Sequence, residues 1–149
     1  MTRVVHVARR GVRSPLSAQR IAALAVQVLR AERVRSAELS ITLVTAPAIA
    51  FLNARHLGHR GATDVIAFPF AAPAEDAPVV GDIYIAPGVA RANARRHAVS
   101  AREELARLVV HGTLHVLGHE HPDDRDARLT APMWRRQEQL LRRFRVSWQ

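Results

Sequence analysis

One eleven-residue segment, HGTLHVLGHEH at residues 111–121, holds four of the chain's eight histidines. A capping box at residues 100–103, followed by apolar residues at helical spacing, predicts a helix over residues 101–117. His111 and His115 are four residues apart on this helix, so their side chains share one face. Imidazole is a common neutral ligand of zinc. The helix is therefore predicted to carry two metal ligands near its C-terminal end.

A third ligand requires the chain to turn after this helix. If the helix continued, His121 would lie about 15 Å along the axis from His111. Gly118 removes this obstacle, because glycine readily adopts the left-handed conformation that ends helices. His121 then joins His111 and His115, and three protein ligands leave a tetrahedral ion one open position, as catalytic sites do. His119 is the alternative third ligand, although its place directly after the turn favours a role facing solvent or substrate.

The same spacing, H-x3-H-x2-G-x2-H, is found in the metzincin proteases, with one change here. Gly112 occupies the position of their glutamate, the general base that takes a proton from zinc-bound water. Peptide hydrolysis by that route is therefore disfavoured, and a zincin-type metalloprotease is kept only as an alternative function. Zinc is the ion that three imidazoles favour, although imidazole also suits nickel, copper and iron.

The histidine segment resembles the HGxLHLxGYDH signature of the YbeY family, the bacterial rRNA maturation endoribonucleases. His119 stands at the tyrosine position of that signature and Glu120 at its aspartate position. Two upstream blocks also resemble the family, TDVIAFPF at residues 63–70 and GDIYI at residues 81–85. The similarity extends over residues 39–133, which is most of the chain.

This resemblance implies a zinc-dependent endoribonuclease that cleaves single-stranded ribosomal RNA, in maturation of the 16S rRNA 3′ end and in ribosome quality control. It implies one Zn²⁺ ion per chain, bound by the three histidines. The implied partners are ribosomal RNA and the small ribosomal subunit, with ribosomal proteins or GTPases as further candidates. For the proton acceptor we consider the metal-bound water itself, His119 and Glu120. Attack by the 2′-hydroxyl of the RNA is an alternative route.

One position departs from the family pattern near the predicted site. The family typically carries a Tyr-Arg pair where this chain has His56 and Leu57, and that arginine is thought to contribute to activity. Arg55, His59 or Arg60 would supply the cation from a neighbouring position, and Arg60 is our candidate catalytic residue. A non-enzymatic ribosome-assembly factor is the alternative function that Leu57 favours.

The net charge of +9 arises from 22 cationic residues, all of them arginine. Arginine binds phosphate through paired hydrogen bonds, so this charge favours a nucleic-acid partner, although a base-composition bias of the genome produces the same excess. The absence of cysteine excludes disulfides and thiolate metal sites. Because the chain has neither a secretory signal nor an apolar run of membrane-spanning length, we expect a cytoplasmic protein that does not bind membranes.

At 149 residues the chain is predicted to form a single domain, residues 1–149. We expect an α+β fold, in which a small mixed four-stranded sheet packs with about five helices and the central helix carries the metal-binding histidines. The predicted strands are residues 2–7, 39–45, 63–68 and 79–85. The predicted helices are residues 15–33, 47–56, 87–98, 101–117 and 125–145.

Two acidic residues near strand starts, Asp64 and Asp82, are candidates to hydrogen-bond a ligand histidine and fix its tautomer. The simpler interpretation is that each only caps or ends a strand. Met133 is interpreted as a core residue in preference to a side chain beneath the metal.

Overall fold

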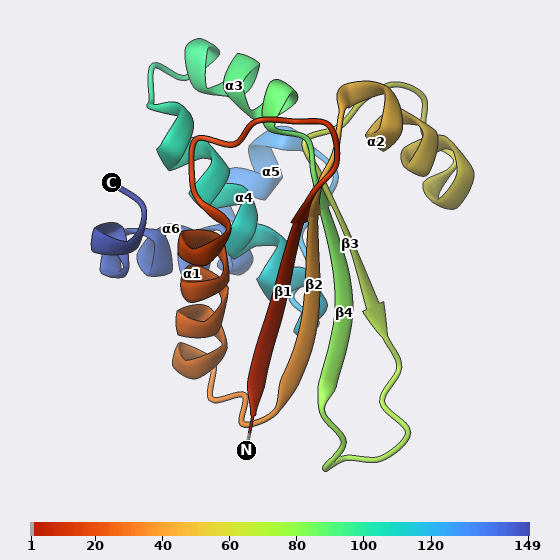
Figure 1. Cartoon of the computed structure of the whole chain (residues 1–149), viewed down its shortest axis with the longest axis vertical. Helices are drawn as coiled ribbons and strands as arrows, with labels where there is room; N and C mark the ends of the chain where they lie inside the picture. Colours follow the sequence, from red (N-terminus) through yellow and green to blue (C-terminus); the bar gives the residue numbers. More distant parts are fainter. Residues whose placement is uncertain (1) are drawn as a thin grey trace.

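The computed structural model describes residues 2–149, which form a four-stranded sheet with helices packed on it (Figure 1). The strands are β1 Arg3–Arg9, β2 Ala37–Leu43, β3 Val65–Phe70 and β4 Val79–Ile85. The α-helices are α1 Ala18–Ala31, α2 Ala46–Leu52, α3 Pro87–Arg96, α4 Ala101–Val116, α5 Arg125–Thr130 and α6 Pro132–Arg143. A π-helix, Asn53–Leu57, extends α2, and a 3₁₀ turn, Arg145–Ser147, lies near the C-terminus. Among the helices described, none has the length and apolar character needed to cross a membrane.

The sheet is mixed, as predicted, and its strands run in the order β1-β2-β4-β3. β1, β2 and β4 are parallel, while the edge strand β3 pairs with β4 in the antiparallel direction. Along β2 the apolar side chains of Leu39, Ile41 and Leu43 are fully buried, whereas Glu38 is exposed. This alternation shows that one face of the sheet packs against the core.

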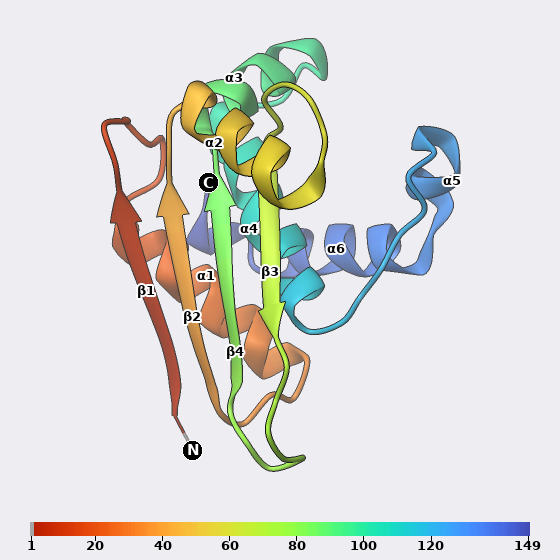
Figure 2. The ribbon, with the colours of Figure 1, turned by 90° about the vertical axis from the view of Figure 1, so that its right-hand side faces the viewer.

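The helices α1 and α4 cover that face, α6 packs against α4, and α2 lies at one end of the opposite face (Figures 1 and 2). The apolar residues of α1 recur at helical spacing and are all fully buried: Ile21, Leu24, Ala25, Val28 and Leu29. The helix begins later than predicted. Ser17 is its N-cap and accepts a hydrogen bond from the backbone of Arg20, whereas Ser14 caps nothing and instead donates to the carbonyl of Leu16.

The helix α4 is central, in contact with β3, β4, α1, α3 and α6. Two glycines allow it to approach the sheet closely. A Cβ atom added to Gly112 of α4 would lie 2.8 Å from Cγ2 of Ile83, and one added to Gly81 of β4 would lie 2.5 Å from Cγ1 of Val116. Gly112 of the histidine segment and Gly81 of the GDIYI block therefore both belong to the close contact between α4 and β4.

The predicted helix over residues 125–145 is wrong in one respect, because it is two helices, which gives six α-helices in the described residues. Ala131 separates α5 from α6 and has an extended backbone, with φ −69° and ψ 150°. Pro132 follows it, and the proline ring disfavours the helical conformation in the preceding residue. Met133 begins the buried side of α6 and is 2% exposed, as a core residue.

Candidate metal centre

The three predicted ligands, His111, His115 and His121, lie together as a cluster of half-buried side chains. One ligand nitrogen from each falls within 4.8 Å of the others. The ring centroids are separated by 4.6 Å for His111 and His115, 5.1 Å for His111 and His121, and 4.8 Å for His115 and His121. The rings thus form a nearly equilateral triangle around one point.

A turn at Gly118 brings His121 back to the end of α4, as the sequence predicted. Gly118 adopts φ +97°, in the left-handed region. Its N–H donates to the carbonyl of His115, and the N–H of His119 donates to the carbonyl of Leu114, both at 3.0 Å. This pair of hydrogen bonds is the Schellman motif, which ends a helix and reverses the chain.

Each ring of the cluster is held through its Nδ1 atom. Nδ1 of His111 lies 2.6 Å from Oε1 of Gln137, Nδ1 of His115 lies 2.9 Å from the carbonyl of His119, and Nδ1 of His121 lies 2.9 Å from the carbonyl of Pro122. Because oxygen atoms of this kind only accept hydrogen bonds, each Nδ1 carries the proton. The three Nε2 atoms therefore keep their lone pairs, which is the tautomer that a metal ion requires.

Burial keeps the imidazoles of His111 and His115 neutral. It lowers the pKa of His111 from 6.5 to about 4, helped by the charges of His115 and His121 and opposed by the hydrogen bond to Gln137. Burial and the charge of His121 likewise lower the pKa of His115. Neutral imidazoles bind metal ions without first losing a proton, so the donor set fits a divalent ion at neutral pH.

Comparison with known proteins identifies the family to which this fold and site belong. The sequence model described as "Endoribonuclease YbeY" matches residues 8–145 of the chain. The chain belongs to the YbeY family. The Endoribonuclease YbeY of Frankia casuarinae is 38% identical over 155 residues, covering 97% of this chain and 74% of that protein. The Endoribonuclease YbeY of Thermobifida fusca is 36% identical over 141 residues, covering 89% of each chain.

A solved structure shares the fold. The solution structure of TM1509 from Thermotoga maritima matches with a TM-score of 0.62 at 24% identity, covering 93% of this chain and 87% of that chain. The family match confirms the resemblance to the YbeY family that the motifs predicted. The predicted α+β fold is confirmed as well, with His111 and His115 on the central helix α4.

In this member of the YbeY family, the side chain that supports a ligand is Gln137, which the sequence analysis missed. Neither Asp64 nor Asp82 bonds a ligand histidine. Asp64 instead accepts a hydrogen bond of 3.1 Å from Nδ2 of Asn93. Burial raises the pKa of Asp64, although its backbone hydrogen bonds and the charge of Arg128 oppose the shift. Gln137 is fully buried on the apolar side of α6, and that unusual placement of a polar residue was the available signal.

The candidate catalytic residues His119 and Glu120 follow Gly118 in the turn. The backbone carbonyl of His119 accepts a hydrogen bond from the His115 ring. The ring of His119 itself lies near α1, with its Nε2 atom 3.9 Å from Oε1 of Glu32. The same Glu32 oxygen accepts a hydrogen bond of 2.9 Å from Nε of Arg136. Glu120 is exposed. Their roles in proton transfer stay predictions.

Arg60 lies in an exposed loop that follows the π-helix. Among residues 2–149 it has no hydrogen-bond or ion-pair partner. Leu57, at the end of the π-helix, is 46% exposed. The guanidinium of Arg55 lies 5.9 Å from the ring centroid of Phe51. A catalytic role of Arg60 stays a prediction.

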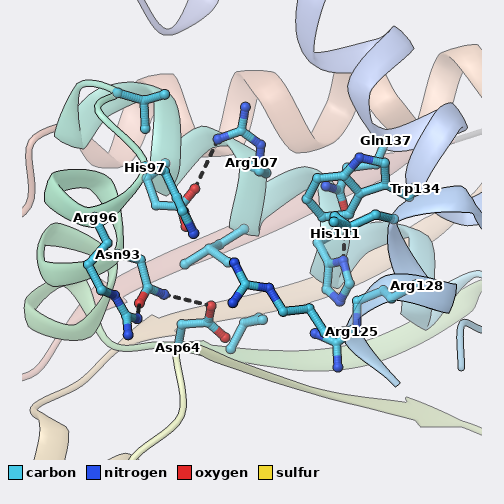
Figure 3. A pocket seen from close by; sticks show the side chains of 15 residues that line it. Asp64, Asn93, Arg96, His97, Arg107, His111, Arg125, Arg128, Trp134 and Gln137 are labelled. Atoms are coloured by element: carbon cyan, nitrogen blue, oxygen red, sulfur yellow. Dashed lines mark hydrogen bonds and ion pairs between the residues drawn. The ribbon is translucent and has the colours of Figure 1, made fainter. Parts of the chain in front are cut away.

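A cavity of about 690 Å³ opens beside His111, between the elements α3, α4, α5 and α6 (Figure 3). Its lining combines cationic, acidic and aromatic side chains. Those used below are Arg96, Arg107, Arg125, Arg128 and Trp134. The metal centre therefore has an adjoining space in which a substrate can lie.

Proposed function

We propose that the chain is a metal-dependent endoribonuclease that cleaves single-stranded RNA, with ribosomal RNA as its substrate and the 3′ end of 16S rRNA as its site of action. The observation that carries the proposal is the convergence of three imidazoles, each held through Nδ1, beside a cavity lined with arginines. Membership of a family whose relatives are called endoribonucleases supports it.

Zinc is the proposed ion, with one per chain, because three imidazoles with one open position form its usual catalytic coordination. His111, His115 and His121 would hold it. When bound, a divalent ion polarises a phosphoryl oxygen and activates water near neutral pH. The surrounding protein groups hold the imidazoles in the right tautomer, and the arginines bind the charged backbone of the substrate.

The proton that must leave the attacking group has two candidate acceptors in the chain, His119 and Glu120. Both lie in the turn between His115 and His121, so either is close to the metal centre along the chain. The carboxylate of Glu32, 3.9 Å from Nε2 of His119, would orient the His119 ring, whereas the side chain of Glu120 is exposed. Separate His119→Phe and Glu120→Gln variants, assayed for cleavage, assign the role to whichever loses activity.

The protease alternative is disfavoured by packing at Gly112. Since an added Cβ there would lie 2.8 Å from Ile83, α4 has no room for the glutamate that metzincins use as a base. The non-enzymatic ribosome-assembly factor remains the second candidate, favoured by the leucine at position 57, where the family typically has arginine. We propose the cytoplasm as the location, where ribosomal RNA is processed.

The test is cleavage of a short single-stranded RNA by zinc-loaded protein, beside His115→Ala and the control His6→Ala, which alters an exposed histidine of β1. Metal content is measured for each variant. We expect the unaltered protein and His6→Ala to hold about one ion and cut, and His115→Ala to do neither. Equal cutting by His115→Ala would overturn the metal-dependent mechanism. RNA binding without any cutting would favour the assembly-factor function.

A further inference from the structure

The cavity beside His111 carries more positive charge than its own carboxylates neutralise. Arg107 is fully engaged, because it forms ion pairs of 2.9 Å with Glu103, Glu104 and Glu138. Arg96 is hydrogen-bonded to Oδ1 of Asn93. The guanidinium groups that remain belong to α5.

Arg125 and Arg128 are the two cavity arginines of α5, one turn apart on the same side of the helix. In the part of the chain that the structure describes, neither forms an ion pair with a carboxylate. Figure 3 shows both on the side of the cavity where His111 lies. Their charge is therefore available to an anion bound there.

Arg128 shows the clearest need for such a ligand. Its Nη2 donates to the carbonyl of Asp123 at 3.2 Å, whereas its Nε atom is buried without a hydrogen-bond partner. A buried donor left unpaired is costly, and a phosphate oxygen is the acceptor that a guanidinium binds most strongly, through two parallel hydrogen bonds. The unpaired Nε marks Arg128 as the cavity arginine whose hydrogen bonds are least satisfied within the protein.

The remaining features of the cavity match a nucleotide. The half-buried indole of Trp134 also lines it, and aromatic rings bind nucleobases by stacking. The volume of about 690 Å³ is ample for one nucleotide. A cationic group and an aromatic ring in one cavity are the pair of features by which proteins bind single-stranded nucleic acid.

We propose that this cavity is a nucleotide subsite, in which Arg128, assisted by Arg125, binds the phosphate next to the cleaved bond and Trp134 stacks on the base. The inference rests on the proposed function, because it takes single-stranded RNA as the ligand. It assigns substrate positioning to α5 and α6, whereas the sequence analysis sought the cation in the loop that contains Arg60.

The first experiment measures binding of a fluorescein-labelled eight-nucleotide RNA to zinc-loaded protein by anisotropy, with the intactness of the RNA checked on a gel after each titration. Arg128→Gln is compared with Arg142→Gln, which alters an exposed arginine of α6 outside the cavity. We expect Arg128→Gln to bind about tenfold more weakly and to lower the salt dependence of binding by about one counterion. Arg142→Gln should bind like the unaltered protein.

Two further variants test the subsite independently, in case Arg128→Gln does not fold. Arg125→Gln alters an exposed side chain and is expected to weaken binding about threefold. Trp134→Phe tests the stacking role, because RNA should quench tryptophan emission in the unaltered protein and much less in this variant, whose remaining Trp148 is buried. If Arg128→Gln and Arg125→Gln both bind RNA as tightly as the unaltered protein, or if quenching in Trp134→Phe is unchanged, the subsite is overturned.

A parallel cleavage assay separates this inference from the proposed function. If RNA binding depends on Arg128 but the zinc-loaded protein cuts no RNA, the subsite stands and the endoribonuclease function fails. If the protein cuts RNA and Arg128→Gln both binds and cuts normally, the function stands and the subsite fails. If the unaltered protein does not bind the RNA, the subsite is overturned directly.

Discussion

Gln137 accepts a hydrogen bond from His111 across the contact between α4 and α6, with 2.6 Å between Oε1 and Nδ1. The side-chain amide of Gln137 cannot flip without losing a second hydrogen bond, because its Nε2 atom donates to Oε2 of Glu138 at 3.1 Å. Glu138 is in turn an ion-pair partner of Arg107 on α4. One partly buried chain of polar groups therefore fixes both the tautomer of a candidate metal ligand and the packing of the helix that carries it.

Replacing Gln137 with leucine is expected to weaken metal binding by about tenfold to a hundredfold, because His111 loses the acceptor that holds its ring. Zinc affinity is measured by competition with a chelator of known affinity. The control is Gln19→Leu, an exposed glutamine of α1. Equal zinc affinity in Gln137→Leu and Gln19→Leu would show that packing alone orients the ring.

The clustering of the three candidate ligands was predictable because their arrangement is local. Two histidines one helical turn apart and a glycine that ends the helix determine where three side chains lie, with no reference to the rest of the fold. The carbonyl of His119 that holds His115 belongs to the same turn. Gln137 is different, since it lies 26 residues from its partner His111, and only the tertiary packing of α6 brings the two together.

The fold was predictable from the sequence to a similar extent. The sequence pattern alone predicted the helix α1 and the strand β2. The break at Ala131 followed from a local rule about the residue before proline, and the prediction of one long helix overlooked it. The arginines beside the metal centre were not separable from the others, because with 22 arginines the sequence does not reveal which of them meet in one cavity.

Substituting alanine for Gly112 is expected to lower the free energy of unfolding by about 1–3 kcal/mol, because the new methyl group overlaps Ile83 in a packed contact. The matched control is Gly88→Ala in α3, where an added Cβ meets nothing within 4 Å. That variant should be as stable as the unaltered protein or slightly more stable. Urea unfolding at neutral pH measures both, and equal stabilities would show that α4 can shift away from β4.

Removing the charge of Arg107 is expected to destabilise the fold through Glu104, which is 4% exposed and forms an ion pair with it. Burial raises the pKa of Glu104, and Arg107 opposes that shift. Arg107→Met should therefore cost about 3–5 kcal/mol in unfolding free energy. Adding Glu104→Gln should recover part of the loss, because the amide leaves no unpaired charge. The control is Arg135→Met on the exposed side of α6, and an equal effect of the two methionine variants would contradict the ion-pair argument.

The stability of the metal-free protein should decrease as the pH falls from about 6.5 towards 4. The pKa of His111 is about 4 in the folded protein, below its ordinary value of 6.5, so in this range the unfolded chain binds a proton that the folded protein does not. The stabilisation is therefore fully present above pH 6.5 and is lost as the pH falls through the folded pKa, and it is on the order of 3 kcal/mol. Burial of His115 acts in the same direction.

Urea unfolding in the presence of a chelator, at several pH values between 4 and 7, measures this dependence. His111→Asn should give a flatter profile than the unaltered protein, because the titrating imidazole is gone. His6→Asn, at an exposed position of β1, should follow the unaltered protein. If all three profiles are parallel, burial of His111 does not control the acid sensitivity of the fold. The tautomer held by Gln137 would then be the main contribution of this environment to metal binding.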